Sequence, residues 1–389
     1  MNDIASSPQT SSDGHIRDRR PNVLISGGGV AGLALAYWLE KEGFHSTVVE
    51  RSPALRQGGQ AVDIRGVALD VVKAMDLHDD IYALRTRLRG MSVLDADGKE
   101  IERTEERTFS AGRLDSDDIE IFRDDLCRLL TDKAGAQVEY LYGDSIRELA
   151  QDGQGASVVF RGGQQRRFDL VVGADGIYSN VRKLVFGEDA PYLVPLGVTM
   201  ALYTAPNLIE LKHWQLMYRD GGVGYVIYPN RDQSELRLCI GFANNETVPK
   251  DDMAAQKAQV ASECARLGGS IPRLLESLPD TDQFYYGELA QVRMPSWSDG
   301  CVVLAGDAAH CASPFSGQGT SLALVGAMVL AKELGRAKHD PAIAFAAYEQ
   351  RMRPYVELNQ ALVDMHRRGP APDEQMYAAK HGIDLGGLL

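Results

Sequence analysis

Short apolar runs alternate with glycine-rich turns and apolar helical stretches along much of this chain. Asn22 to Ser26 is one such run, a helical pattern follows from about Val30 to Glu42, and Ser46 to Glu50 is a second run. Near the other end, Cys301 to Ala305 precedes a helical stretch from Thr320 to about Leu334. Unbroken apolar runs of this length are typical of buried parallel strands. The pattern therefore predicts an α/β fold built on a parallel sheet.

Two other segments alternate polar and apolar residues, as half-exposed antiparallel strands do. They are residues 89–107, with a turn at Ala96 to Gly98, and a long stretch from about 191 to 284. Within the second stretch, residues 251–278 have a helical pattern that would cover one face of the predicted sheet. A further helix is predicted from about Asp340 to Arg367, although Pro354 lies inside it.

The first glycine-rich turn has the spacing G-x-G-x-x-G, between a predicted strand and a predicted helix. The first glycine of this spacing makes a tight turn, the second lets the backbone approach a pyrophosphate, and the third lets the helix pack on the strand. Glu50 lies 21 residues after Gly29 and would accept a hydrogen bond from a ribose 2′-hydroxyl, which suits FAD or NAD rather than NADP. The predicted cofactor contacts here are Gly27, Gly29, Val30, Ala31, Gly32, Glu50 and Arg51.

The second turn, GDAAHCASPFSGQG, has a different glycine spacing and is not a phosphate loop of that type. Asp307 at a strand end, followed by small residues, suits a sugar-like hydroxyl chain. The free N–H groups that open the next helix can bind a flat heterocycle and stabilise negative charge on it. We interpret His310 as a structural residue. The predicted contacts are Asp307, Pro314, Gly317, Gln318, Gly319 and Thr320.

Three motifs in order give the chain a family resemblance: GGGVAG from Gly27, DLVVGADGIYSNVR from Asp169, and GDAAH from Gly306. On these motifs the chain resembles the class A flavoprotein monooxygenases of the para-hydroxybenzoate hydroxylase type. The segment RQGGQAVDIR, from Arg56 to Arg65, is also similar to that of the tetracycline-inactivating flavin monooxygenases.

The resemblance implies a Rossmann-like FAD-binding domain of the GR2 type, with an inserted antiparallel-sheet substrate domain and a C-terminal helix. It also implies cofactor contacts at Arg56, Asp63, Arg123 and Asp175, and a ribityl contact at Asp307. Ordinary roles stay open for these residues. The two arginines could be surface charges, Asp63 could cap a strand end, and Asp175 could cap the helix that begins near Tyr178.

We expect the chain to divide into several parts. Residues 1–20 would be a disordered tail. The FAD-binding domain would comprise 21–75, 108–190 and 285–335, the substrate domain 76–107 and 191–284, and the C-terminal helix and tail 336–389.

The resemblance further implies the reaction. NADPH or NADH reduces FAD, O2 adds to the flavin, and a C4a-hydroperoxide hydroxylates an aromatic or polyketide-type molecule, tetracycline being one hypothesis. Because the cofactor carries this chemistry, we assign no catalytic side chain and no metal. The alternatives are a flavin dehydrogenase or reductase without oxygen transfer, and a non-enzymatic nucleotide-binding module. The predicted substrate contacts, which at strand spacing are also typical of plain core, are Met200, Trp214, Met217, Tyr225 and Tyr228.

Composition mainly excludes partners. A net charge of -13 argues against binding to nucleic acid or an anionic membrane. The five cysteines are scattered without a CxxC pair, which indicates reduced thiols and no zinc site. We therefore expect a cytoplasmic, monomeric enzyme whose partners are a small aromatic molecule and O2.

Overall fold

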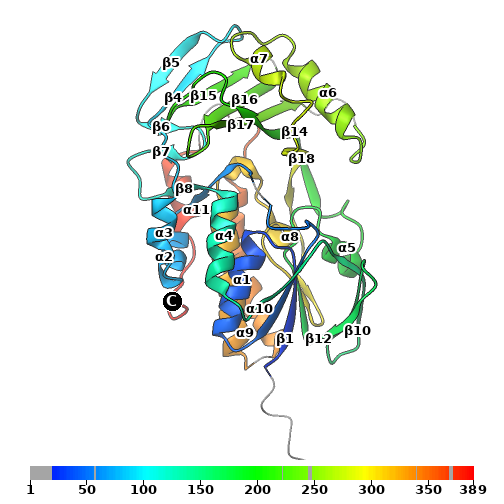
Figure 1. Cartoon of the computed structure of the whole chain (residues 1–389). Helices are drawn as coiled ribbons and strands as arrows, with labels where there is room; N and C mark the ends of the chain where they lie inside the picture. Colours follow the sequence, from blue (N-terminus) through cyan, green and yellow to red (C-terminus); the bar gives the residue numbers. More distant parts are fainter. Residues whose placement is uncertain (1–19, 57, 221, 244–247, 339, 368–370) are drawn as a thin grey trace, which may run out of the picture.

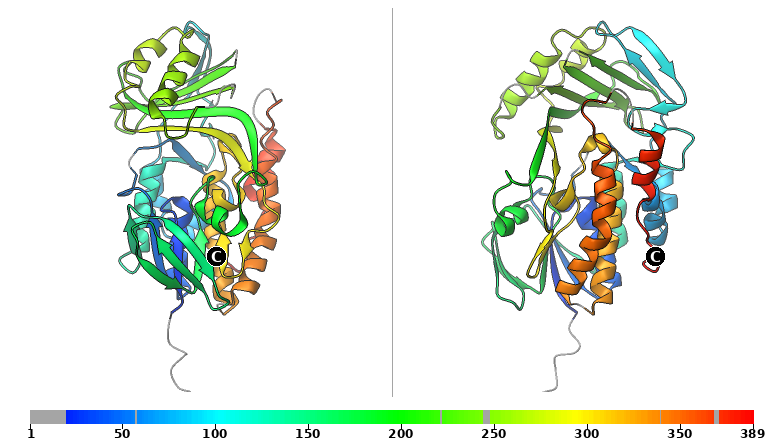
Figure 2. Two further views of the ribbon diagram at one scale, coloured as in Figure 1. Left: turned by 90° about the vertical axis from the view of Figure 1, so that its right-hand side faces the viewer. Right: turned by 180° about the vertical axis from the view of Figure 1, so that it is seen from behind.

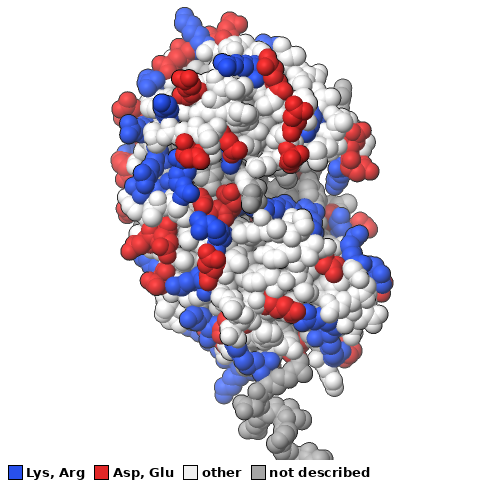
Figure 3. All heavy atoms as spheres, in the orientation of Figure 1, with Lys and Arg blue, Asp and Glu red and all other residues white. Residues whose placement is uncertain are grey.

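The computed structural model describes residues 20–56, 58–220, 222–243, 248–338, 340–367 and 371–389 (Figure 1). Apart from Arg20, the expected N-terminal tail lies outside these ranges. Within them, no helix combines the length and apolarity needed to cross a bilayer. On the face drawn in Figure 3, acidic and basic side chains are intermixed.

A six-stranded sheet forms the centre of the larger part of the molecule. Its strands come from distant parts of the sequence, and all pair in parallel except the edge strand β19. The run from Asn22 to Ser26 is β1 and lies inside this sheet, as its unbroken apolar pattern predicts. In spatial order the strands are β19 (Ser298–Asp299), β20 (Val302–Leu304), β13 (Leu170–Gly173), β1 (Asn22–Ser26), β2 (His45–Glu50) and β9 (Glu139–Tyr142).

Helices cover one face of this sheet, and a three-stranded antiparallel sheet lies on the other side (Figures 1 and 2). Residues 31–39 of α1 are all buried, because α1 packs against the sheet and against α4 and α9. The helices are α1 (Val30–Lys41), α4 (Arg123–Ala134), α9 (Gly319–Arg336) and α10 (Pro341–Gln360). The small sheet contains β10 (Ile146–Gln151), β11 (Ala156–Phe160) and β12 (Gln165–Phe168).

A seven-stranded sheet forms the second part, drawn at the top of Figure 1. It is antiparallel except where β15 pairs with β4, and α6 (Met253–Cys264) and α7 (Ile271–Leu275) cover one face. Its strands, in spatial order, are β18 (Phe284–Val292), β14 (Leu193–Pro206), β17 (Glu235–Ala243), β16 (Val223–Pro229), β15 (Gln215–Asp220), β4 (Met91–Leu94) and β5 (Glu100–Thr104).

β14 and β18 are the long strands that connect this sheet to the larger part (Figure 2). Their pairing extends from Tyr203 opposite Phe284 to Leu193 opposite Val292. β18 therefore continues eight residues beyond residue 284, where we expected the substrate domain to end.

Short elements complete the fold. β3 (Ala61–Ile64) pairs with β8 (Ile119–Phe122), and β6 (Arg107–Thr108) pairs with β7 (Gly112–Arg113). The remaining elements are α2 (Val67–Ala74), α3 (His78–Ala83), α5 (Asn180–Phe186), α8 (Asp307–His310), the 3-10 turn η1 (Pro314–Ser316) and α11 (Asp373–His381).

The C-terminal prediction of one helix from Asp340 to Arg367 is wrong at its end. α10 stops at Gln360 and tolerates Pro354 inside it, and α11 follows as a separate helix that packs against α10. The sequence between them contains Pro370 and Pro372, and the second of these directly precedes α11.

Candidate cofactor and substrate site

The first glycine turn is shaped by backbone crowding. A Cβ on Gly27, whose φ is +115°, would lie 2.3 Å from the carbonyl oxygen of Ala174, and a Cβ on Gly32 would lie 2.0 Å from that of Gly27. A Cβ on Gly29 would meet no atom of the described chain within 4 Å. Gly27 and Gly32 thus close the turn, and Gly29 leaves open space beside the N-terminus of α1, which fits a bound pyrophosphate.

Glu50 lies at the end of β2, directly beside this turn. Its two carboxylate oxygens accept hydrogen bonds from the backbone N–H groups of Gly28 and Ser52, both at 2.9 Å. Burial opposes ionisation, but these N–H groups and the Arg56 guanidinium 3.8 Å away outweigh it, so the pKa of Glu50 is lowered. Glu50 is therefore an ionised acceptor, as ribose binding requires. Arg51 is exposed next to it.

The second turn meets the first in space. A Cβ on Gly306 would lie 2.8 Å from the Cβ of Ala31 in α1, so the two glycine-rich segments touch although they are about 280 residues apart in sequence. Asp307 follows as the first residue of α8. Asp307 remains exposed, yet burial raises the pKa of its carboxyl, an effect that a hydrogen bond with Cys311 reduces. It is a carboxylate that solvent can reach but that protein largely encloses.

The loop after α8 leads into the N-terminus of α9. Gly317 adopts the left-handed conformation with φ at +63°, and the buried Gln318 is the residue before the helix. The Gln318 side chain donates to the sulfur of Met376 at 3.4 Å, whereas its Oε1 has no partner among the described residues. A Cβ on Gly319 would have open space around it within the described chain. Pro314 is exposed and Thr320 is half-buried.

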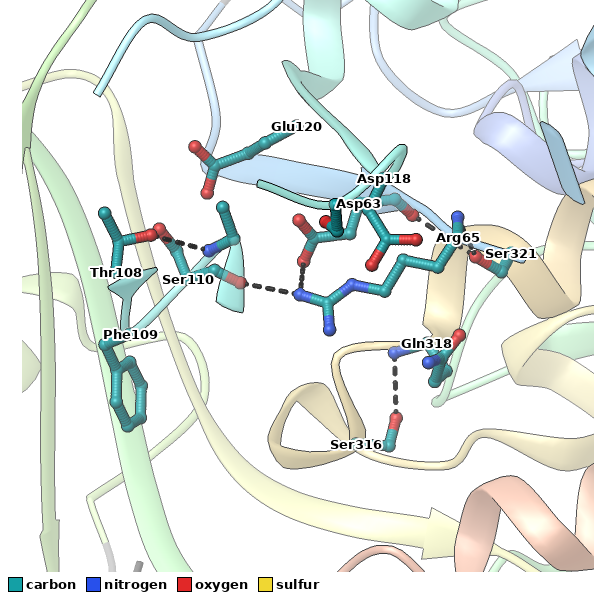
Figure 4. A network of polar contacts seen from close by, with 12 residues as sticks. Asp63, Arg65, Thr108, Phe109, Ser110, Asp118, Glu120, Ser316, Gln318 and Ser321 are labelled. Carbon is teal, nitrogen blue, oxygen red and sulfur yellow. Dashed lines mark hydrogen bonds and ion pairs between the residues drawn. The ribbon is translucent and has the colours of Figure 1, made fainter. Parts of the chain in front are cut away.

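Asp63 and Arg65 form a buried ion pair next to this loop (Figure 4). Their Oδ2 and Nη2 atoms are 2.9 Å apart, and the Cζ of Arg65 lies 3.5 Å from where a Cβ on Gly317 would be. Burial raises the pKa of Asp63 to about 7, although Arg65 opposes the shift. The position of Asp63 on β3 brings it to the second turn, which is consistent with a cofactor contact.

The two arginines carried over by resemblance lie near the same edge. Arg123 begins α4, and its Nε lies 3.0 Å from where a Cβ on Gly59 would be, so the RQGGQAVDIR segment and Arg123 are neighbours. The Arg56 Nε donates to the Ser52 hydroxyl at 2.7 Å, close to Glu50. Both are placed so that they could contact an anionic cofactor group.

Asp175 caps a helix. Its carboxylate accepts hydrogen bonds from the Ser179 hydroxyl and from the N–H groups of Asn180, at 2.8 Å, and Val181, at 3.1 Å. The ordinary role that the sequence left open is therefore the one its side chain has. Its backbone nevertheless borders the first turn, because a Cβ on Gly27 would lie 3.0 Å from the Asp175 Cα.

His310 is a core residue. It is 2% exposed, its ring centroid lies 4.7 Å from that of Trp297, and its Nε2 is 3.3 Å from the Tyr348 hydroxyl. Burial lowers the pKa of His310 to about 4, so it stays neutral at physiological pH. This agrees with a structural role.

Three of the five predicted substrate contacts lie on the face of the seven-stranded sheet away from α6 and α7. Met200 and Met217 alternate with residues of the core beneath these helices, so their side chains point to the other face. Tyr228 is on this face too. Its hydroxyl accepts from the N–H of Ala61 at 3.0 Å, and its ring stacks near Phe122.

The other two lie elsewhere. The prediction for Tyr225 is wrong, because its ring packs 5.5 Å from that of Tyr218 in the core under α6 and α7. The Trp214 ring is held beside β4 and β5, where its Nε1 donates to the Ser92 hydroxyl at 2.8 Å and Arg103 lies over the ring. Neither placement supports a substrate contact.

Sequence reasoning missed three exposed aromatic residues near the junction of the two parts: Phe109, Tyr285 and Phe315. Tyr285 lies on β18, and β18 contacts α8, the helix that begins with Asp307 in the second turn. Phe315 had a signal, since it lies between Pro314 and Gly317 in the motif itself. Phe109 had none, because nothing in the local pattern shows where its short hairpin docks.

Comparisons with known proteins agree with this geometry. A family model described as FAD binding domain matches residues 20–363. A flavin-dependent monooxygenase of Legionella longbeachae is 34% identical, covering 87% of this chain and 86% of its own. An uncharacterized protein of Mycobacterium tuberculosis is 42% identical over 93% of this chain and 98% of its own.

Two solved structures are similar over most of their length. The tetracycline destructase Tet(55) is 34% identical, covers 94% of this chain and 98% of its own, and has a TM-score of 0.83. The tetracycline destructase Tet(51) is 33% identical, with coverages of 88% and 89% and a TM-score of 0.81.

The fold and the two adjoining glycine turns thus define an FAD-binding oxidoreductase. The chain belongs to the flavin-dependent monooxygenases, with FAD as its cofactor and NAD(P)H as the reductant typical of the class. The predictions of an α/β FAD-binding fold, of FAD, and of a monooxygenase are confirmed, and the alternatives of a dehydrogenase without oxygen transfer and of a non-enzymatic module are not retained.

Proposed function

We propose that this enzyme hydroxylates a flat, hydroxyl-bearing aromatic or polyketide molecule, and that tetracycline is the first compound to test. The observation that carries the proposal is the similarity to two tetracycline destructases over at least 88% of this chain. The methionines on the open face of the seven-stranded sheet support it, because flexible apolar side chains suit a broad, flat ligand.

The proposed roles in cofactor binding follow the two turns. The N-terminus of α1 and Gly29 hold the pyrophosphate, Glu50 accepts from the ribose, and Asp307 accepts from the ribityl hydroxyls. The N–H groups at the start of α9 face the isoalloxazine ring. FAD, when bound, supplies the activation of O2. The chain positions the substrate and keeps water from the reacting atoms.

The parts of the chain have matching tasks in this proposal. The six-stranded sheet with its helices is the FAD-binding domain, and the seven-stranded sheet binds the substrate. We place the end of the substrate-binding part after Val292 rather than at residue 284, because β18 belongs to the seven-stranded sheet. The five cysteines are free, four of them buried, which suits a reducing compartment such as the cytoplasm, with the enzyme acting as a monomer.

The test is turnover of the FAD-loaded enzyme with NADPH, 18O2 and a panel of hydroxylated arenes that includes tetracycline. We expect one panel member to accelerate NADPH oxidation and to gain a single labelled oxygen, measured by product mass. NADPH oxidation accelerated by a compound that gains no label would contradict the proposal. Omitting the enzyme and omitting NADPH are the controls.

A further inference from the structure

A small hairpin presents an exposed aromatic ring where the two parts of the molecule meet. β6 and β7 form this hairpin, and Phe109 follows β6 directly. Phe109 is 50% exposed, whereas its neighbour Thr108 is buried. In Figure 4 the Phe109 ring points away from the polar side chains of the network.

Buried polar groups fix the backbone on both sides of this ring. The Gln215 Oε1 accepts from the N–H of Phe109 at 2.6 Å, and the Gln215 Nε2 donates to the Ser110 hydroxyl at 2.7 Å. Arg65 donates to the carbonyl oxygen of Ser110 at 2.8 Å. Gln215 is 0% exposed and Arg65 is 6% exposed, so water competes little for these bonds.

Gln215 and Arg65, which together we call the clamp, connect the hairpin to both parts of the molecule. Gln215 is the first residue of β15, in the seven-stranded sheet, and points to the face away from α6 and α7. Arg65 contacts the Gly317 turn of the cofactor site. Phe109 is therefore held between the sheet face that carries Met217 and the loop that begins α9.

The charged groups at this clamp are unfavourable to bury, so stability alone does not explain the arrangement. Arg65 is buried with Asp63, and Glu120 lies opposite Asp63 in the β3–β8 pair, also buried. Burying such charges costs solvation free energy that their attraction barely recovers. A rigid, exposed ring on this clamp loses little conformational entropy when a flat ligand binds to it.

We propose that Phe109 is a substrate-binding residue whose ring stacks on the aromatic system of the substrate, and that Gln215 is the positioning residue that holds it in place. The inference rests on the proposed function for the class of ligand, a flat arene. It assigns the stacking surface to a hairpin outside the glycine motifs and outside the five predicted substrate contacts.

Binding is the direct test, measured without NADPH so that no turnover is involved. FAD-loaded enzyme is titrated with 2-naphthol, 1,8-dihydroxyanthraquinone and tetracycline, and the dissociation constant is read from flavin fluorescence. For the probe that binds the wild type best, Phe109→Ala should weaken binding about tenfold, and Phe109→Tyr should keep it within about threefold, since stacking survives.

Two further variants separate stacking from general damage. Tyr82→Ala removes an aromatic residue of similar exposure, 49%, from α3 and should leave binding unchanged. Gln215→Ala should lower the affinity for 2-naphthol much more than that for the saturated analogue decahydro-2-naphthol. A purely structural role of Gln215 would lower both equally.

Wild-type affinity in Phe109→Ala would overturn the proposal, and so would the failure of all three probes to bind the wild type. These results are distinct from a failure of the proposed function. If Phe109→Ala weakens binding but no probe gains labelled oxygen, the stacking role stands and the hydroxylation proposal fails. If a probe gains labelled oxygen but binds the variant as tightly as the wild type, hydroxylation stands and the stacking role fails.

Discussion

The two parts of this enzyme form their sites in different ways. The cofactor side relies on backbone, since Gly27 and Gly32 have no room for a Cβ and Gly29 leaves space for a ligand. The substrate site that we propose on the sheet side relies on side chains, such as Met217 and Phe109. A backbone site is therefore visible in the sequence as glycine spacing, whereas a side-chain site depends on which face of a strand is covered.

The sharpest test of the backbone site uses two glycine variants. Gly32→Ala brings a Cβ to 2.0 Å from the Gly27 carbonyl oxygen, so both apoprotein stability and FAD binding should collapse. Gly29→Ala should leave the melting temperature of the apoprotein unchanged and still weaken FAD binding by about a hundredfold or more, because the new methyl group occupies the ligand's space. Calorimetry and flavin titration measure the two effects. Normal FAD binding in Gly29→Ala would contradict the proposed pyrophosphate position.

The cofactor region is shaped mainly by backbone, but we propose that Asp307 binds FAD through its side chain. Its substitution therefore measures how much a side chain contributes in that region. Asp307→Ala should weaken FAD binding by about ten- to hundredfold, since a charge-assisted hydrogen bond to the ribityl chain is lost. The apoprotein should not lose stability, because burial raises the pKa of Asp307 and so its charged form is unfavourable in the fold. Asp299→Ala, on the edge strand β19, is the control. Retention of FAD equal to wild type would show that the ribityl contact lies elsewhere.

Asp63, in the ion pair next to the second glycine turn, makes the free energy of unfolding depend on pH. Its pKa is raised from 3.8 to about 7, so the unfolded chain releases this proton more readily than the folded one. The stability contribution is complete below about pH 4 and is lost as pH rises to about 7, by up to a few kcal/mol. Asp63→Asn should flatten the dependence of the unfolding free energy on pH in this window, whatever its effect on absolute stability. Denaturant unfolding at several pH values measures it, and an unaltered slope would contradict the assignment.

The smallest expected effects are changes in KM caused by substitutions on the two faces of the seven-stranded sheet. Met217→Ala, on the open face, should raise the KM for the substrate about threefold with little change in melting temperature. Tyr225→Phe, under α6 and α7, should leave KM unchanged. Steady-state kinetics with the substrate identified by the oxygen-labelling screen provide the comparison. A larger effect of Tyr225 than of Met217 on KM would reverse our assignment of the faces.

Much of the cofactor side could be predicted because its signals are local. β1 has the predicted bounds, α1 and α9 begin within one residue of prediction, and Glu50 lies beside the turn as its spacing indicates. The sheet side could not be predicted to the same depth. Tyr225 and Tyr228 are three residues apart on one strand, so alternation alone places them on opposite faces, but only the packing of α6 and α7 shows which of the two faces is covered. The end of α10 was missed because residues 361–367 contain no glycine or proline that would mark it in the sequence.

The contact between Gly306 and Ala31 also concerns the order of events during synthesis. β1 and α1 are made first, but β20 and the start of α9 follow only after about 300 residues. Contacts so distant in sequence form late and slowly during folding. A growing chain therefore lacks the second glycine turn of its flavin site until about residue 320 of 389 has been made, so both turns can bind FAD together only late in synthesis. FAD bound to both turns thereby reports that synthesis has passed the second glycine turn.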